Sequence, residues 1–104
     1  MIYHTLTIGG DEYRLRLTSG AIKAIEKKLG QSLFNAIENI QDNMMDTITA
    51  ILWGAIQPLN ANFSYQKADG LFDQYINDGN TVEDLMQEIN ALFEVSGFCQ
   101  KGQA

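Results

Sequence analysis

Residues 2–17 read IYHTLTIGGDEYRLRL, and this stretch decides the fold because its apolar side chains recur at every second position. The apolar residues that share a face are Ile2, Leu6 and Ile8 before the two glycines, and Tyr13, Leu15 and Leu17 after them. Such alternation predicts two strands, and glycines at positions 9 and 10 suit the tight turn of an antiparallel hairpin. An isolated hairpin is marginally stable in water, so we expect its apolar face to lie on helices.

The apolar period changes at Thr18, from two to about 3.6 residues. This change predicts a helix over residues 19–29. Thr18 is suited to the N-cap position because its hydroxyl can accept an N–H of the first turn. Gly30 is suited to the left-handed residue that ends the helix.

Four further helices are expected from apolar residues at helical spacing, over residues 33–40, 44–57, 65–77 and 82–96. The residues expected to begin these four helices are, in order, Ser32, Asp42 or Asn43, Ser64 and Thr81. Thr81 would form an imperfect capping box with Asp84, and Gly97 is expected to end the last helix. The fold class is therefore α+β and mainly α, with an N-terminal hairpin packed on a compact bundle of about five helices. We expect one domain over residues 1–97 and a flexible tail over residues 98–104.

The formal net charge of −6 and the pI near 4.5 make the chain acidic, which argues against a general binder of nucleic acid. The longest apolar stretch, around ITAILWGAI, is shorter than the roughly 20 residues that a membrane span requires. The single cysteine cannot form an internal disulfide, and the N-terminus lacks the pattern of a signal peptide. These features predict a cytoplasmic protein without a membrane partner.

No group of residues predicts catalysis. His4 is the one histidine and shares a strand face with Ile2 and Leu6, so we interpret it as structural. Cys99 has no second cysteine or neighbouring histidine, and the acidic pairs at helical spacing are typical of solvated surface. The sequence also contains no GxxxxGK[ST] or GxGxxG phosphate loop and no nucleophile elbow. We therefore expect no enzyme activity, no cofactor and no metal.

The positive charges are gathered near the N-terminus. Residues 1–30 hold five Lys or Arg against three acids, whereas residues 31–104 hold two against ten, which gives +2 and −8. Either these cations are simply solvated, or they contact an acidic partner or the acidic helical half of another copy, which would make a homo-oligomer. The candidate partner-binding residues are Arg14, Arg16, Lys23, Lys27 and Lys28, together with the large apolar residues Trp53 and Phe63, since some aromatic side chains exceed the needs of so small a core.

A known family shares this order of elements. The hairpin ending in YRLRLT, the helix AIKAIEKKLG, the short helix SLFNAIE and the apolar helix ILWGAIQP resemble the tail assembly chaperones of long-tailed phages and prophages of Gram-positive hosts. The likeness spans Thr7 to Pro58, and beyond Phe63 it rests on helical pattern and length.

The resemblance implies a small non-enzymatic helical protein of the host cytoplasm that is absent from the mature virion. It would bind the tape measure protein, keep this long chain soluble and help to recruit tail tube subunits. The cations would then form a basic end that docks the acidic end of a neighbouring copy. The alternatives are a small regulatory or nucleic-acid-binding module, and a structural morphogenesis component that is retained in the virion.

Overall fold

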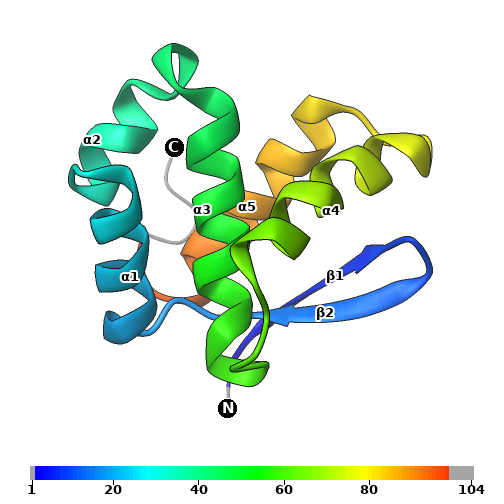
Figure 1. The fold of residues 1–104 in the computed structure, drawn as a ribbon, viewed down its shortest axis with the longest axis horizontal. Coiled ribbons are helices and arrows are strands. Elements are labelled where there is room, and N and C mark those ends of the chain that lie inside the picture. The colour runs from blue at the N-terminus through cyan, green and yellow to red at the C-terminus, as the bar shows by residue number, and fades with distance from the viewer. Residues whose placement is uncertain (1, 99–104) are drawn as a thin grey trace.

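The computed structural model describes residues 2–98 as a two-stranded hairpin beside five α-helices, which confirms the α+β, mainly α prediction (Figure 1). In chain order the elements are β1 (His4–Ile8), β2 (Asp11–Leu15), α1 (Ser19–Leu29), α2 (Leu33–Glu38), the 3₁₀ turn η1 (Ile40–Asp42), α3 (Met44–Ile56), the 3₁₀ turn η2 (Gln57–Leu59), α4 (Tyr65–Asn77) and α5 (Val82–Val95). The predicted tail, apart from Phe98, lies outside the described residues.

Helix α3 is the centre of the molecule. Nine of its residues between Thr47 and Ile56 are buried, which a helix achieves only when neighbours cover it on most sides. Figure 1 shows α1 and α2 on one side of α3, and α4 and the hairpin on the other. The alternating residues Leu6, Ile8 and Leu15 of the hairpin are buried in the same core.

The hairpin turn requires its two glycines. Gly9 and Gly10 have φ of 62° and 83°, and two positive φ values in a two-residue loop form the turn type that follows the twist of antiparallel strands. The backbone N–H of Gly9 donates to Asp78 Oδ2 at 2.6 Å, which ties the turn to the C-terminal end of α4. A Cβ atom on Gly9 would also lie 2.8 Å from Gln74 Cγ.

The predicted helix caps form, with one exception. The hydroxyls of Thr18, Ser32, Ser64 and Thr81 each accept a backbone N–H, and Thr81 and Asp84 complete a reciprocal capping box. Of the two residues predicted to cap α3, Asn43 does occupy the N-cap position, but its side chain makes no capping hydrogen bond. Its φ and ψ of −152° and 50° follow from the preceding 3₁₀ turn and differ from the extended conformation of an N-cap.

Helix α5 ends as expected at a left-handed glycine. Gly97 has φ of 75°, its N–H donates to Glu94 O, and the N–H of Phe98 donates to Phe93 O at 2.9 Å. These two bonds form a Schellman motif, and the Phe93 and Phe98 rings, 5.1 Å apart, supply its apolar contact.

Four predicted ranges are too long, and the one over residues 82–96 is so by a single residue, because α5 ends at Val95. The strands cover His4–Ile8 and Asp11–Leu15 rather than all of residues 2–17. Helix α2 ends at Glu38 rather than 40, because the Asn39 side chain donates to Asn35 O at 3.0 Å and competes with the helical pattern. Helix α3 ends at Ile56 rather than 57, since Pro58 sends the chain into η2.

Candidate interaction surface

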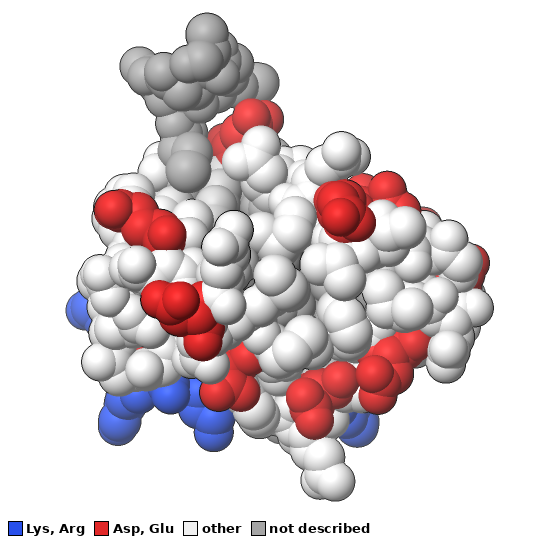
Figure 2. Space-filling view, turned by 90° about the horizontal axis from the view of Figure 1, so that it is seen from above, with Lys and Arg blue, Asp and Glu red and all other residues white. Residues whose placement is uncertain are grey.

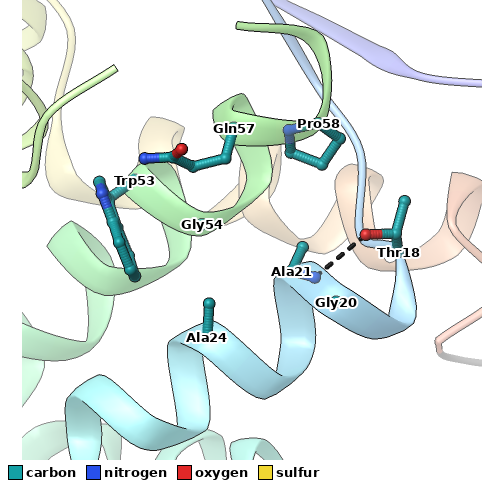
Figure 3. A pocket seen from close by; sticks show the side chains of 8 residues that line it. All are labelled: Thr18, Gly20, Ala21, Ala24, Trp53, Gly54, Gln57 and Pro58. Carbon is teal, nitrogen blue, oxygen red and sulfur yellow. Dashed lines mark hydrogen bonds between the residues drawn. The ribbon is translucent and has the colours of Figure 1, made fainter. Parts of the chain in front are cut away.

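An open groove of about 300 Å³ lies between α1 and the C-terminal half of α3 (Figure 3). Its lining residues are Thr18, Gly20, Ala21 and Ala24 from the start of α1, and Trp53, Gly54, Gln57 and Pro58 from the end of α3 and η2. Figure 3 shows Trp53 at one end of the groove and Thr18 and Pro58 at the other. Apart from the Thr18 hydroxyl and the Gln57 amide, the side chains around this groove are apolar.

Small residues make the groove. A Cβ atom on Gly54 would lie 2.3 Å from Ile25 Cγ1, so only glycine permits α1 to cross α3 this closely. Gly20 and Ala24 lie one turn apart on α1, and neither has a side chain long enough to fill the space beside the crossing. The groove is therefore a direct result of residue size along one row of α1.

A lysine and two aromatic rings meet beside the groove, where α1, α3 and α4 come together. Lys28 Nζ lies 4.2 Å from the centre of the Tyr65 ring and 5.9 Å from that of Trp53. The two rings are 5.7 Å apart in an edge-to-face arrangement. Aromatic faces attract cations, so both rings hold the ammonium group of Lys28 in place at the Trp53 end of the groove.

Carboxylates lie close to this cluster as well. Burial is the main cause that raises the pKa of Tyr65, and the nearby negative charges of Asp46 and Asp69 raise that pKa further. The Trp53 end of the groove therefore carries both signs of charge, and Lys28 is not part of a purely basic surface.

The other predicted cations spread over two elements. Lys23 and Lys27 are exposed on α1, on either side of Ala24 in sequence. Arg14 is exposed on β2 with its guanidinium 5.6 Å from the centre of the Tyr3 ring, and Arg16 is half-buried with its backbone N–H bonded to Ala55 O. Figure 2 shows basic side chains along one margin of the molecule and acidic side chains spread across the face that is in view.

The two predicted aromatic partner residues have different positions. Trp53 is half-buried and lines the groove. Phe63 is only 6% exposed and contacts Tyr13 edge-on, with ring centres 5.9 Å apart. The prediction of a surface role is wrong for Phe63, because a ring that fills the space between the hairpin and the loop before α4 has no face left for a partner.

Several residues of this surface were not singled out from the sequence. Tyr65 reads as an ordinary apolar position of α4, and only the three-dimensional meeting of α1, α3 and α4 places it against Lys28. The exposed large apolar residues are Ile2, Tyr3, Phe34 and Met45, and Phe34, at 60% exposure, stacks on Phe98 with ring centres 4.6 Å apart. No periodic signal separates these residues from the core.

His4 has a partner that the sequence does not indicate. Its Nε2 lies 2.7 Å from Glu88 Oε1, a contact that joins β1 to α5 across 84 positions of sequence. Within residues 2–98, no group of three His, Cys, Asp or Glu side chains is arranged to hold a metal ion. None of the helices described over that range is long and apolar enough to cross a bilayer.

Comparison with known proteins gives one match along nearly the whole chain. Residues 2–104 match the model of a family described as "Family of unknown function (DUF6096)". The chain is also 30% identical over 92 residues to the energy-coupling factor transporter ATP-binding protein EcfA2 of Lactobacillus johnsonii. The alignment covers 88% of this chain but only 29% of that relative. No solved structure matches the chain significantly.

Proposed function

The chain belongs to the family of unknown function DUF6096, and from this premise we propose that it is a phage tail assembly chaperone. In this role it binds the tape measure protein, keeps it soluble and helps to recruit tail tube subunits, without enzyme activity. The support is the resemblance over Thr7 to Pro58, and the single observation that carries the proposal is that this same stretch builds the groove between α1 and α3.

The groove suits a protein client. Its lining is mostly apolar, it is open to solvent at Gly20 and Pro58, and its volume of about 300 Å³ is enough for one or two large apolar side chains. An amphipathic client helix could place such side chains between α1 and α3, with Trp53 as one wall. Tryptophan is among the residue types that are enriched at the energetic hot spots of protein interfaces.

The exposed cations beside the groove add a preference for acidic clients. Lys23 and Lys27 are four residues apart and share the row of α1 next to that of Gly20 and Ala24, so carboxylates on that one side of a bound apolar side chain would meet them. The acidic remainder of the surface would keep the coated client dispersed in solution.

The partial match to the ATP-binding transporter protein does not change this proposal. That relative is more than three times as long as the aligned segment, and the present chain contains no GxxxxGK[ST] loop.

The experiment is a pull-down of the tape measure protein by groove variants. Ala24 is half-buried and lines the groove, so Ala24→Phe should fill the groove and abolish co-purification while the circular dichroism spectrum stays that of the wild type. Gln87→Phe adds the same ring to an exposed position of α5 and should bind like the wild type. Equal capture of the tape measure protein by both variants would show that the groove is not where the client binds.

Two further measurements separate the alternatives. A structural component should be present in many copies in purified virions, whereas the proposed chaperone should be absent from them. A nucleic-acid-binding module should retain DNA or RNA with an affinity that falls steeply with salt, and the proposal predicts no such retention.

A further inference from the structure

The outer edge of β1, on the side away from β2, carries backbone groups without partners. Ile8 pairs with Asp11 across the two-residue turn, and a pair in that position exchanges hydrogen bonds. Bonded and non-bonded pairs alternate along an antiparallel ladder, so His4, Leu6 and Ile8 are the β1 residues whose N–H and C=O groups point toward β2. The N–H and C=O groups of Tyr3, Thr5 and Thr7 therefore point outward.

No described residue hydrogen-bonds to these outward groups. The backbone bonds recorded outside the regular elements over residues 2–98 include none to Tyr3, Thr5 or Thr7. On the outer side of β2, the N–H of Arg16, just beyond the strand, donates to Ala55 O at 2.9 Å, whereas the backbone groups of Glu12 and Arg14 have no described partner either. What separates the two edges is charge, because the outward residues of β2 are Glu12 and Arg14, and those of β1 are uncharged.

This edge also lacks the usual protection against pairing. Natural edge strands commonly carry lysine, proline, inward charge or a bulge. Residues 2–8 contain no lysine and no proline, and Thr5 and Thr7 present small uncharged side chains to solvent. Ile2 shares the alternating face of Leu6, yet it is 63% exposed whereas Leu6 is 5% exposed, because the protein's own core ends before it.

We propose that β1 pairs with β1 of a second copy, antiparallel and centred on Thr5, to form a continuous four-stranded sheet in a twofold dimer. In this register Thr5 lies opposite Thr5 of the second copy, and Tyr3 lies opposite its Thr7. All three outward residues then meet outward residues, so every exposed backbone group of this edge gains a partner. This inference does not depend on the proposed chaperone role.

The strand fits its own copy better than a generic peptide. Ile2 comes to lie opposite Ile8 of the second copy, whose side chain is 1% exposed and part of a core. The dimer therefore covers the one isoleucine that the monomer leaves out. Two chains of net charge −6 can also approach here, because residues 2–8 carry no acidic or basic side chain apart from His4, which is bonded to Glu88.

The first test is sedimentation of the full chain over a range of concentrations. The wild type should reach a dimer, and Thr5→Lys should raise the dimer dissociation constant by about tenfold or more, because it sets two like charges directly opposite each other. Thr5 is exposed, so the monomer should keep its fold. Gln66→Lys, an exposed control on α4, should dimerise like the wild type. A monomeric wild type, or a Thr5→Lys variant that dimerises equally well, overturns the proposal and leaves the edge to another kind of chain.

The second test fixes the register by oxidation to a disulfide. With Cys99→Ser as background, Thr5→Cys places two thiols on directly opposed residues about 5.5 Å apart at Cα, within reach of a disulfide. Thr7→Cys places them four residues out of register, roughly 13 Å apart, which a disulfide cannot span. Covalent dimer from Thr5→Cys but not from Thr7→Cys is expected, and equal yields from the two would refute this pairing.

Discussion

Replacement of Gly54 by alanine tests the helix crossing that creates the groove. The added Cβ would lie 2.3 Å from Ile25 Cγ1, 2.8 Å from its Cδ1 and 3.3 Å from the carbonyl oxygen of Ala21. Ile25 is fully buried, so its side chain has little room to withdraw. The two helices must therefore separate.

The expected loss of stability follows from two opposing terms. Overpacking of a closed core costs typically about 1–3 kcal/mol, and contacts this short place Gly54→Ala at about 3 kcal/mol. Alanine is favoured over glycine inside a helix by about 1 kcal/mol. The net loss is about 2 kcal/mol, which should lower the melting temperature by roughly 8–16 °C for a domain of this size.

Urea unfolding followed by circular dichroism measures this loss, and the chain offers a matched control. Gly70 is a helical glycine of α4 with no atom within 4 Å of an added Cβ, so Gly70→Ala should raise the urea midpoint. A double-mutant cycle combines Gly54→Ala with Ile25→Ala, because Ile25→Ala removes the side-chain atoms that the added Cβ would clash with. The double variant should lose less than the sum of the singles by about 3 kcal/mol, which is the whole overpacking term. A Gly54→Ala midpoint at or above that of the wild type, or fully additive losses, would show that Gly54 does not set the distance between α1 and α3.

Three further changes test the local structure. The hydrogen bond from the N–H of Gly9 is the main cause that lowers the pKa of the exposed Asp78 carboxyl, and the bond from the Gln74 amide lowers it further. The ionised Asp78 carboxylate therefore stabilises the fold fully above the ordinary pKa of 3.8, and this stabilisation is lost as pH falls through the lower pKa of the folded state. The gap in urea midpoint between the wild type and Asp78→Asn should accordingly shrink on acidification, and a gap independent of pH would contradict this. Thr81→Ala removes the N-cap of α5 and should cost about 1 kcal/mol in urea unfolding, more than at an uncapped exposed threonine. Gly30→Ala forces a left-handed alanine at φ of 72° and should cost about 1–2 kcal/mol by the same assay.

The sequence predicts the elements well where local chemistry determines them. Thr18 and Thr81 cap helices because a hydroxyl at that position has a nearby N–H to accept, and Gly30 ends α1 because glycine adopts positive φ without strain. The hairpin follows from alternation and two adjacent glycines. These signals lie within a few residues of one another.

The surface is less predictable because it depends on how helices cross. The closeness of α1 and α3 rests on Gly54 meeting Ile25, and the cluster of Lys28, Trp53 and Tyr65 joins three separate helices. Phe63 is misjudged for the same reason, since its burial depends on contact with Tyr13, 50 positions earlier in the chain. Periodicity describes each helix alone and carries no information about its neighbours.

We propose that this protein holds a tape measure protein in solution. The most direct measurement is the soluble fraction of the longest predicted coiled-coil protein encoded nearby, expressed alone and together with this chain, followed by co-purification. A chaperone should leave the long protein soluble only in the presence of this chain and should elute with it. Equal solubility of the long protein alone, with no co-purification, would contradict the chaperone function.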